Sequence, residues 1–256
     1  MSAAAVILLA AGLFFVVNNF THTERTEPGQ VEYQVVQTVR GQRTTLKLSD
    51  GTHVSVNSNS SLRVPDNYGK QTRTLYLEGE AFFDVAHRSS HPFVVITNHT
   101  YTRVLGTEFN ITAYDSNNVE VAVKEGKVSL GTLEKGRPGE KKAEISRDKL
   151  GIISGAGTVE VSDIREIDQY VGWTEGRLKF RRTPFPEVLE RLQRWYDIDF
   201  IVHNSVSDLS ERTLTATYDN MPLGEVLKVL SISMNVSYTR EGRTVTFYKQ
   251  QNQQNH

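Results

Sequence analysis

The middle of the chain reads LYLEGEAFFDVA at residues 75–86, HPFVVIT at 91–97 and YTRVLG at 101–106. In the first segment apolar residues recur at alternate positions, at Leu75, Leu77, Ala81, Phe83 and Val85. A period of two is typical of strands that bury one face. Breaks at residues 78–80 and 89–92 separate the runs. The stretch therefore predicts β structure with separate strands at 72–77 and 81–86.

The pattern continues on both sides of this stretch and predicts one β domain over residues 35–162. Alternating runs at 45–49 and 53–57 flank Asp50 and Gly51. Asp-Gly between such runs is a strong hairpin signal, because both central residues of the turn take positive φ. Further strands are expected at 93–97, 100–105, 109–114, 119–124, 127–130, 149–153 and 158–161. Many short strands at regular spacing predict a sandwich or a barrel.

Three motifs then occur in order: LxGEAFFxV at 77–85, PFxV at 92–95 and VLGTxFN at 104–110. Together they resemble the periplasmic core of the FecR family of transmembrane anti-sigma regulators. The resemblance implies a jelly-roll-like sandwich for the β domain. It also implies a regulatory protein, not an enzyme.

Residues 163–250 differ in character and contain a repeat. PFPEVLERL at 184–192 returns as PLGEVLKVL at 222–230, 38 residues later. Each unit predicts a strand, a helix that starts at proline, and a second strand. A short helix is also expected from Asp163, as N-cap, to Val171. Two such units predict a small α+β domain, which resembles the C-terminal domain of Bacteroidota-type FecR proteins and is similar to the short N-terminal (STN) fold of TonB-dependent transducers.

The N-terminus carries an uncharged apolar run from Ala3 to Val17. A spanning helix needs about 20 apolar residues, so we interpret residues 1–20 as a membrane helix that begins at or before Met1. A signal peptide and a buried helix are the alternatives. Residues 21–34 are expected to be a linker, and residues 251–256 a disordered tail. We expect the cytoplasmic sigma-binding segment of the family to be absent from this sequence.

The composition argues against several classes of function. The net charge of −1 and the absence of a basic stripe argue against nucleic-acid binding. The chain has no cysteine, so it has no disulfide, thiolate metal site or cysteine nucleophile. No P-loop, GxSxG or HExxH motif occurs. We therefore expect no cofactor and no bound metal.

Three groups of polar or aromatic residues each have a functional and a simpler interpretation. His87 and His91 have a zinc-like spacing on a helix, but they flank a turn, so exposed loop histidines are favoured. A second group consists of the carboxylates Glu78, Glu80 and Asp84. They form either a cluster for calcium binding or acid–base chemistry, or the solvent-exposed face of a strand, and the second interpretation is favoured. The pair Trp195 and Tyr196 forms a sugar or peptide platform, or else one aromatic of the pair faces the core.

The bond between Gly106 and Thr107 is the sharpest chemical candidate. Some FecR proteins cleave themselves at a Gly-Thr bond in this region. The threonine hydroxyl attacks the preceding carbonyl in an N→O acyl shift, and the resulting ester is hydrolysed. The reaction needs a strained bond, a free Oγ and a proton acceptor. The alternative is that Gly106 only serves a bulge or a tight turn.

The resemblance implies an inner-membrane protein with one membrane pass and most of its chain in the periplasm. Its implied partners are the N-terminal signalling domain of an outer-membrane TonB-dependent transporter and an extracytoplasmic-function sigma factor. We expect the transporter contact in the C-terminal domain, by strand addition to the last strand at Val245, Phe247 and Tyr248. The alternatives are a membrane-anchored carbohydrate-binding sandwich and a hydrolase on a β scaffold.

Overall fold

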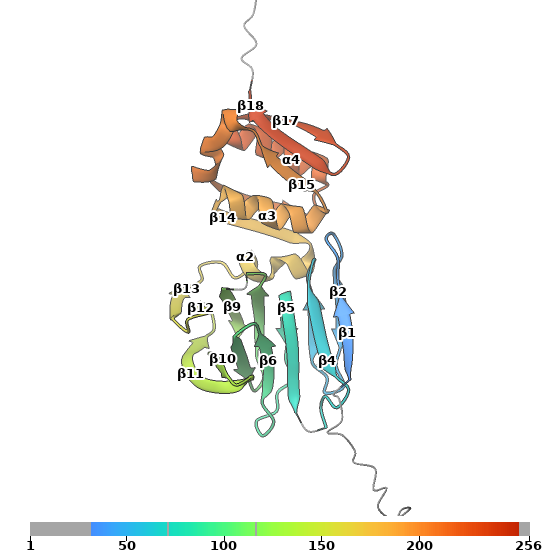
Figure 1. Cartoon of the computed structure of the whole chain (residues 1–256), viewed down its shortest axis with the longest axis vertical. Helices are drawn as coiled ribbons and strands as arrows, with labels where there is room; N and C mark the ends of the chain where they lie inside the picture. Colours follow the sequence, from blue (N-terminus) through green and yellow to red (C-terminus); the bar gives the residue numbers. More distant parts are fainter. Residues whose placement is uncertain (1–31, 71, 116, 251–256) are drawn as a thin grey trace, which may run out of the picture. The chain divides into compact units, whose positions relative to one another are not determined.

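The computed structural model describes residues 32–70, 72–115 and 117–250. Its organising element is β5 (Arg73–Asp84), a single strand of 12 residues. The first half of β5 pairs with β4 (Ser61–Pro65) and β6 (Phe93–Thr97), and the second half pairs with β3 (His53–Val56) and β8 (Glu108–Ala113). β5 thus belongs to two sheets at once (Figure 1). The predicted break at residues 78–80 is wrong, because the strand bends there without ending.

Gly79 makes this bend possible. Its φ of +96° lies in the left-handed region that glycine adopts readily. A Cβ at this position would lie 2.4 Å from Oγ of Ser60. The same Oγ accepts a hydrogen bond from the backbone N–H of Glu80 at 2.9 Å. The close approach of the Ser60 loop, and not a turn, therefore explains why residue 79 is a glycine.

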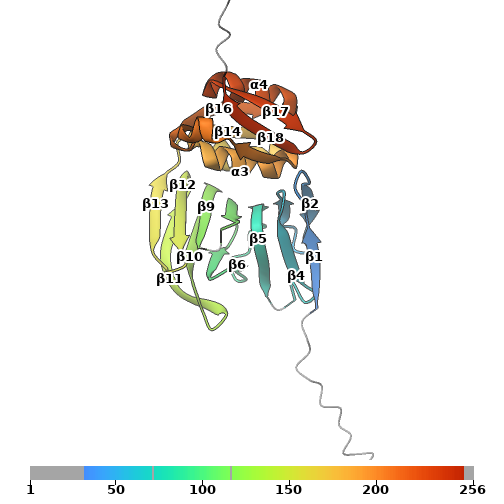
Figure 2. The same ribbon diagram turned by 45° about the horizontal axis from the view of Figure 1, so that its top comes forward.

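The two sheets face each other as a sandwich (Figures 1 and 2). One has the order β1-β4-β5-β6-β7-β10-β11, and the other has the order β2-β3-β5-β8-β9-β12-β13. Neighbours are antiparallel except β5 and β6, which run parallel, unlike the strands of an antiparallel jelly roll. The remaining strands are β1 (Tyr33–Gln37), β2 (Thr44–Lys47), β7 (Thr100–Val104), β9 (Asn118–Glu125), β10 (Lys127–Glu134), β11 (Arg137–Ser146), β12 (Lys149–Ser154) and β13 (Val159–Asp163).

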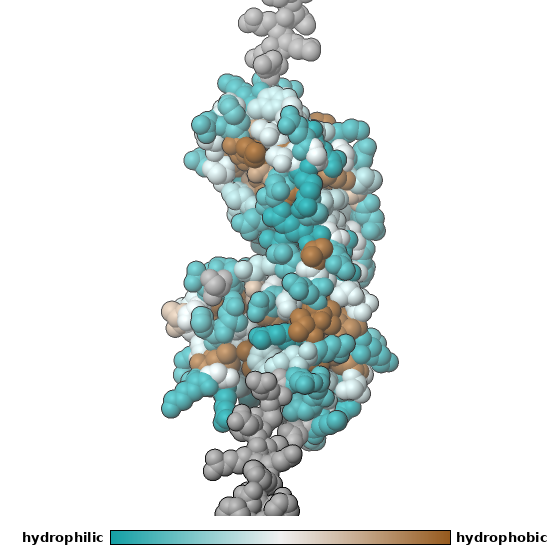
Figure 3. All heavy atoms as spheres, turned by 45° about the vertical axis from the view of Figure 1, so that its right-hand side comes forward, coloured by the Kyte–Doolittle hydropathy of each residue, from teal (hydrophilic) through white to brown (hydrophobic). Residues whose placement is uncertain are grey.

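The core between the sheets comes from the alternation seen in the sequence. Leu75, Leu77, Ala81 and Phe83 are buried and share one side of β5, and Val85, directly after the strand, is buried too. The rings of Phe83 and Phe109 stack with centroids 5.2 Å apart. Figure 3 shows a mostly hydrophilic surface with small apolar areas on the face turned toward the viewer. Burial of these apolar side chains is the main source of sandwich stability.

Asp50 departs from the expected turn geometry. The hairpin of β2 and β3 is present, but only Gly51, and not Asp50, has a positive φ. Asp50 points inward, where its Oδ2 accepts hydrogen bonds from Arg73 Nε at 2.6 Å and from the hydroxyl of Tyr68 at 2.8 Å. Burial alone would raise the pKa of Asp50, but bonds from Thr52, Tyr68 and Arg73 outweigh it and hold the pKa below its ordinary value.

The C-terminal part confirms the predicted repeat. α3 (Phe185–Tyr196) and α4 (Leu223–Met234) begin after Pro184 and Pro222 and end at Asp197 and Asn235, which both adopt the left-handed conformation. The helices pack with one sheet of β14 (Arg177–Pro184) and β16 (Thr213–Asp219) and another of β15 (Asp199–Val202), β18 (Thr244–Lys249) and β17 (Val236–Glu241). The two 3₁₀ helices are Gly172–Glu175 and Asn204–Glu211.

Two local expectations are wrong, and two others lie outside the described residues. Asp163 ends β13 and does not cap a helix, since α2 spans only Asp168–Val171. The predicted linker ends too late, because β1 already begins at Tyr33. The predicted membrane helix at 1–20 and the predicted tail at 251–256 lie outside the described residues. Within the described ranges, no helix is long and apolar enough to span a membrane.

Candidate functional site

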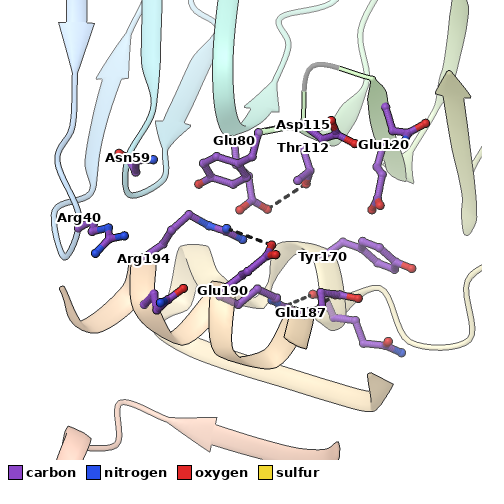
Figure 4. Close-up of a pocket in the computed structure, with 15 residues that line it drawn as sticks. Arg40, Asn59, Glu80, Thr112, Asp115, Glu120, Tyr170, Glu187, Glu190 and Arg194 are labelled. Carbon is purple, nitrogen blue, oxygen red and sulfur yellow. Dashed lines mark hydrogen bonds and ion pairs between the residues drawn. The ribbon is translucent and has the colours of Figure 1, made fainter. Parts of the chain in front are cut away.

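A polar cavity of about 590 Å³ forms where strand ends of the sandwich meet α3. Both belong to one compact unit that starts at Tyr33. Figure 4 shows side chains from the strands and from the helix pointing toward one another. The principal lining residues are Glu80, Thr112 and Glu120 on the sandwich and Glu187, Glu190 and Arg194 on α3. We call this region the junction.

Glu80 is the centre of the hydrogen bonds on the sandwich side. Its Oε2 accepts from Nδ2 of Asn57 at 2.7 Å. Its Oε1 accepts from Nδ2 of Asn110 at 2.9 Å and from Oγ1 of Thr112 at 3.3 Å. Carboxylates with several donors are held in one orientation. Glu80 is therefore a structural anchor of the junction.

Trp173 joins the C-terminal part to this anchor. Its indole Nε1 donates a hydrogen bond to Oδ1 of Asn110 at 3.1 Å, and both side chains are buried. The Asn110 amide thus donates to Glu80 on one side and accepts from Trp173 on the other. A buried amide with both ends satisfied favours one relative placement of the groups it links.

A second set of contacts joins α3 and β15 to the sandwich. The guanidinium of Arg194 lies 4.1 Å from the centroid of the Tyr114 ring. The carbonyl of Arg194 accepts from the backbone N–H of Gly41 at 2.8 Å. Nη1 of Arg40 forms an ion pair with Oδ1 of Asp199 at 2.5 Å. The turn between β1 and β2 is therefore held against the first repeat of the C-terminal part.

The carboxylates of the junction are not all neutralised. Burial, followed by the charges of Glu187 and Glu80, raises the pKa of Glu120. Burial also raises the pKa of Glu187, and the nearby Arg191 guanidinium offsets part of this effect. Like charges that face each other in a partly dry cavity oppose ionisation. Protonation of Glu120 and Glu187 therefore stabilises the junction.

Two family models match the chain and together span more than half of it. The first, described as FecR protein, matches residues 34–129, and the second, described as FecR, C-terminal, matches residues 177–247. The chain belongs to the FecR family. FecR proteins are membrane-anchored, non-enzymatic regulators of the anti-sigma type.

Two solved structures support this placement. Both are crystal structures of an assigned anti-sigma factor from Parabacteroides distasonis ATCC 8503, one at 1.65 Å and one at 2.50 Å resolution. Each superposes on this FecR protein with a TM-score of 0.74 at 26% identity and is covered completely. They cover 85% and 86% of this chain. No match is found among curated protein sequences.

The predicted partner strand of this FecR protein is not an edge. β18 lies between β15, with which it is parallel, and β17, with which it is antiparallel. Val245 and Phe247 are fully buried, and Phe247 stacks on Phe200 at 5.4 Å. The expectation of strand addition at Val245, Phe247 and Tyr248 is wrong in its premise, because hydrogen bonds to two neighbours already occupy the backbone of β18. The edges of this sheet are β15 and β17.

Gly106 and Thr107 lie between β7 and β8, beside the loop that follows β5. The hydroxyl of Thr107 is buried and donates to the carbonyl of Lys127 at 3.0 Å. A Cβ on Gly106 would lie 2.5 Å from Nδ1 of His87, so the imidazole packs directly on this glycine. Tight packing explains Gly106, and cleavage of the Gly106–Thr107 bond stays a prediction.

The remaining candidates are dispersed. Of the carboxylates on β5, Glu80 serves the junction, while Asp84 lies 3.9 Å from Nδ1 of His53. The guanidinium of Arg43 covers the Trp195 ring at 3.6 Å, and the Tyr196 hydroxyl donates to the carbonyl of Met221 at 2.5 Å. Across the described chain, no three His, Asp or Glu side chains gather as metal ligands would.

Sequence reasoning missed the junction although two of its residues stand inside the FecR motifs. Glu80 belongs to LxGEAFFxV and Asn110 to VLGTxFN. A polar residue within a motif gives no information about its hydrogen-bond partner. The contact with Trp173 depends on how the C-terminal part folds back, which strand periodicity does not encode.

Proposed function

We propose that this FecR protein relays the loaded state of an outer-membrane TonB-dependent transporter to an extracytoplasmic-function sigma factor. Membership of an anti-sigma family supports the regulatory end of this pathway. We further propose a single-pass inner-membrane location, with residues 32–250 in the periplasm. The sigma factor would contact a segment on the cytoplasmic side of the membrane.

The observation that carries the proposal is the junction itself. A relay needs a contact region whose geometry can respond to a partner. Glu80, Asn110 and Trp173 join the two parts through directional hydrogen bonds, while the apolar cores of the two parts are separate clusters. Such polar contacts have discrete partners, so a change of geometry must exchange them for other hydrogen bonds and not leave them unmade.

The transporter contact is proposed at β15, in place of β18. Within residues 32–250 as described, β15 has a strand partner on only one side. It exposes Ile201 and Val202, which are 52% and 37% accessible. An exposed apolar edge can accept an added strand, with backbone hydrogen bonds supplying affinity. β15 begins at Asp199, the partner of Arg40, so binding there would act next to the sandwich contact.

A pull-down from membranes that contain the neighbouring transporter tests this function, with the detergent-solubilised full chain as bait. We expect capture that requires the transporter's N-terminal signalling domain. Ile201→Lys should weaken capture, while Thr239→Lys, on the opposite edge strand β17, should not. Capture that survives deletion of the signalling domain, or no capture at all, would contradict the relay.

Carbohydrate binding remains a second candidate because of one observation. Tyr33 and Tyr76 lie edge to face on the outer side of the sandwich, with ring centroids 5.6 Å apart, and Arg63 lies over both rings. Exposed aromatic rings can stack on sugars. Glycan-array binding that Tyr33→Ala abolishes, with no transporter capture, would favour this function over the relay.

A further inference from the structure

A second cavity, of about 470 Å³, opens on the sandwich away from the junction. This cavity lies at the start of β6. A different pocket, lined by Asn98 and Tyr114, lies at the opposite end of the same strand. The walls of the cavity at the start of β6 come from the start of β5 and the loop before it, the loop before β6, the end of β7 and the start of β11. Its volume is in the range of small-molecule sites. We call it the arginine pocket.

Three arginines line this pocket and no carboxylate does. Arg73 is buried and neutralised, because its Nε lies 2.6 Å from Oδ2 of Asp50. Arg88 donates one hydrogen bond, from Nη2 to the carbonyl of Asp50 at 3.3 Å. Arg103 lies over the ring of Tyr101 at 5.3 Å. Among the described residues, neither Arg88 nor Arg103 forms an ion pair with a carboxylate. The pocket therefore has an uncompensated positive charge.

Apolar side chains lie next to these guanidinium groups. Val94 is paired directly with Arg103 on the neighbouring strand and with Thr74 on the other side. Pro92 and Pro138 complete the apolar lining. A guanidinium provides a fork of donors that matches the oxygens of a carboxylate or a phosphate. A cavity with both features suits a ligand that is charged at one end and apolar at the other.

We propose that the arginine pocket binds a small organic oxyanion, in which a carboxylate or phosphate group is carried on an apolar body. Arg88 and Arg103 bind the oxyanion, and Val94, Pro92 and Pro138 contact the apolar body. Arg73 supports the wall but is already satisfied by Asp50. The site is independent of the proposed transporter relay, because it uses neither the junction nor β15.

Isothermal titration of the full chain in nonionic detergent tests the site, with phthalate and phenyl phosphate as probes. We expect saturable binding of at least one probe, and no binding of the neutral dimethyl phthalate. Arg88→Ala and Arg103→Ala should each weaken binding by about tenfold, the loss of roughly one charge-assisted contact. Arg240→Ala is the matched control, because Arg240 is an exposed arginine of β17 outside the pocket.

Other results would overturn the proposal. Absence of saturable binding with both probes would do so, as would equal loss of affinity in Arg240→Ala. Inorganic phosphate that binds as tightly as phenyl phosphate would show an anion site without an apolar requirement. The Arg103→Lys variant keeps the positive charge but loses the forked guanidinium donors. Its urea denaturation midpoint, measured in parallel with the titration, shows whether a loss of binding reflects a loss of stability. Unchanged affinity in both alanine variants would place the probe elsewhere.

Discussion

The indole Nε1 of Trp173 donates a hydrogen bond to Oδ1 of Asn110 across 63 residues of sequence. Asn110 belongs to β8 of the sandwich, and Trp173 belongs to the 3₁₀ helix that leads into the C-terminal part. The same amide donates to Glu80 on β5. One asparagine thus connects the strand shared by both sheets with the segment that carries the C-terminal fold.

Removal of the indole donor should destabilise the chain. Trp173→Phe keeps most of the apolar volume but leaves the buried Oδ1 of Asn110 without this donor. We expect a loss of about 1–3 kcal/mol in the free energy of unfolding, the usual cost of an unsatisfied buried polar atom. Urea denaturation measures it. Trp195→Phe is the control, since that indole is only partly buried and stacks under Arg43. Equal losses in both variants would contradict the assigned role.

The buried pair of Arg73 and Asp50 should be strongly coupled. Arg73→Met leaves the Asp50 carboxylate in the core without its cation, and we expect a loss of about 3–5 kcal/mol. The double variant with Asp50→Asn should lose less than the sum of the two single losses, because neither charge is then stranded. A double-mutant cycle by urea denaturation measures this coupling. Additive losses would show that the two side chains act independently.

Glu120 should make the junction sensitive to pH. Its pKa in the folded chain is raised above the ordinary value, so the folded state binds this proton more tightly than the unfolded state. The associated stability is complete below the ordinary pKa and is lost as the pH rises through the raised pKa. Glu120→Gln is neutral throughout. We expect its stability relative to wild type to increase as the pH rises from the ordinary carboxyl pKa through the raised one.

Urea denaturation at several pH values tests the effect of Glu120. The matched control is Glu160→Gln, because Glu160 is an exposed carboxylate on β13. A pH dependence that is the same in the Glu120→Gln variant and in wild type would exclude Glu120 as its source.

Self-cleavage at Gly106–Thr107 can be tested directly on a gel. If the Thr107 hydroxyl attacks the Gly106 carbonyl, the amide bond is replaced by an ester that water then hydrolyses. Wild-type protein should therefore yield two fragments and Thr107→Ala a single intact chain. His87 packs on Gly106, so His87→Ala should slow cleavage if the imidazole accepts the proton. The Thr102→Ala variant, which removes another buried threonine hydroxyl, is the control. One intact band for wild type would contradict the prediction.

Local patterns in the sequence predicted much of the secondary structure. Alternation at Leu75, Leu77, Ala81 and Phe83 identified the buried face of β5, because a strand repeats every two residues. The repeat after Pro184 and Pro222 identified both helices, because proline fixes φ at a helix start and the apolar residues recur at helical spacing. These signals act between residues close in sequence, so they are visible without the fold.

Only the tertiary structure decided which strands lie at an edge and which polar groups meet. β18 has the alternation of a half-buried strand, and nothing in its own residues tells that β15 and β17 pair on both of its sides. The Asp-Gly pair predicted the hairpin, but only the fold shows that Arg73 and Tyr68 meet Asp50 in the core. Strand pairing and buried hydrogen bonds join residues that are distant in sequence, so the junction and the arginine pocket exist only once the chain has folded.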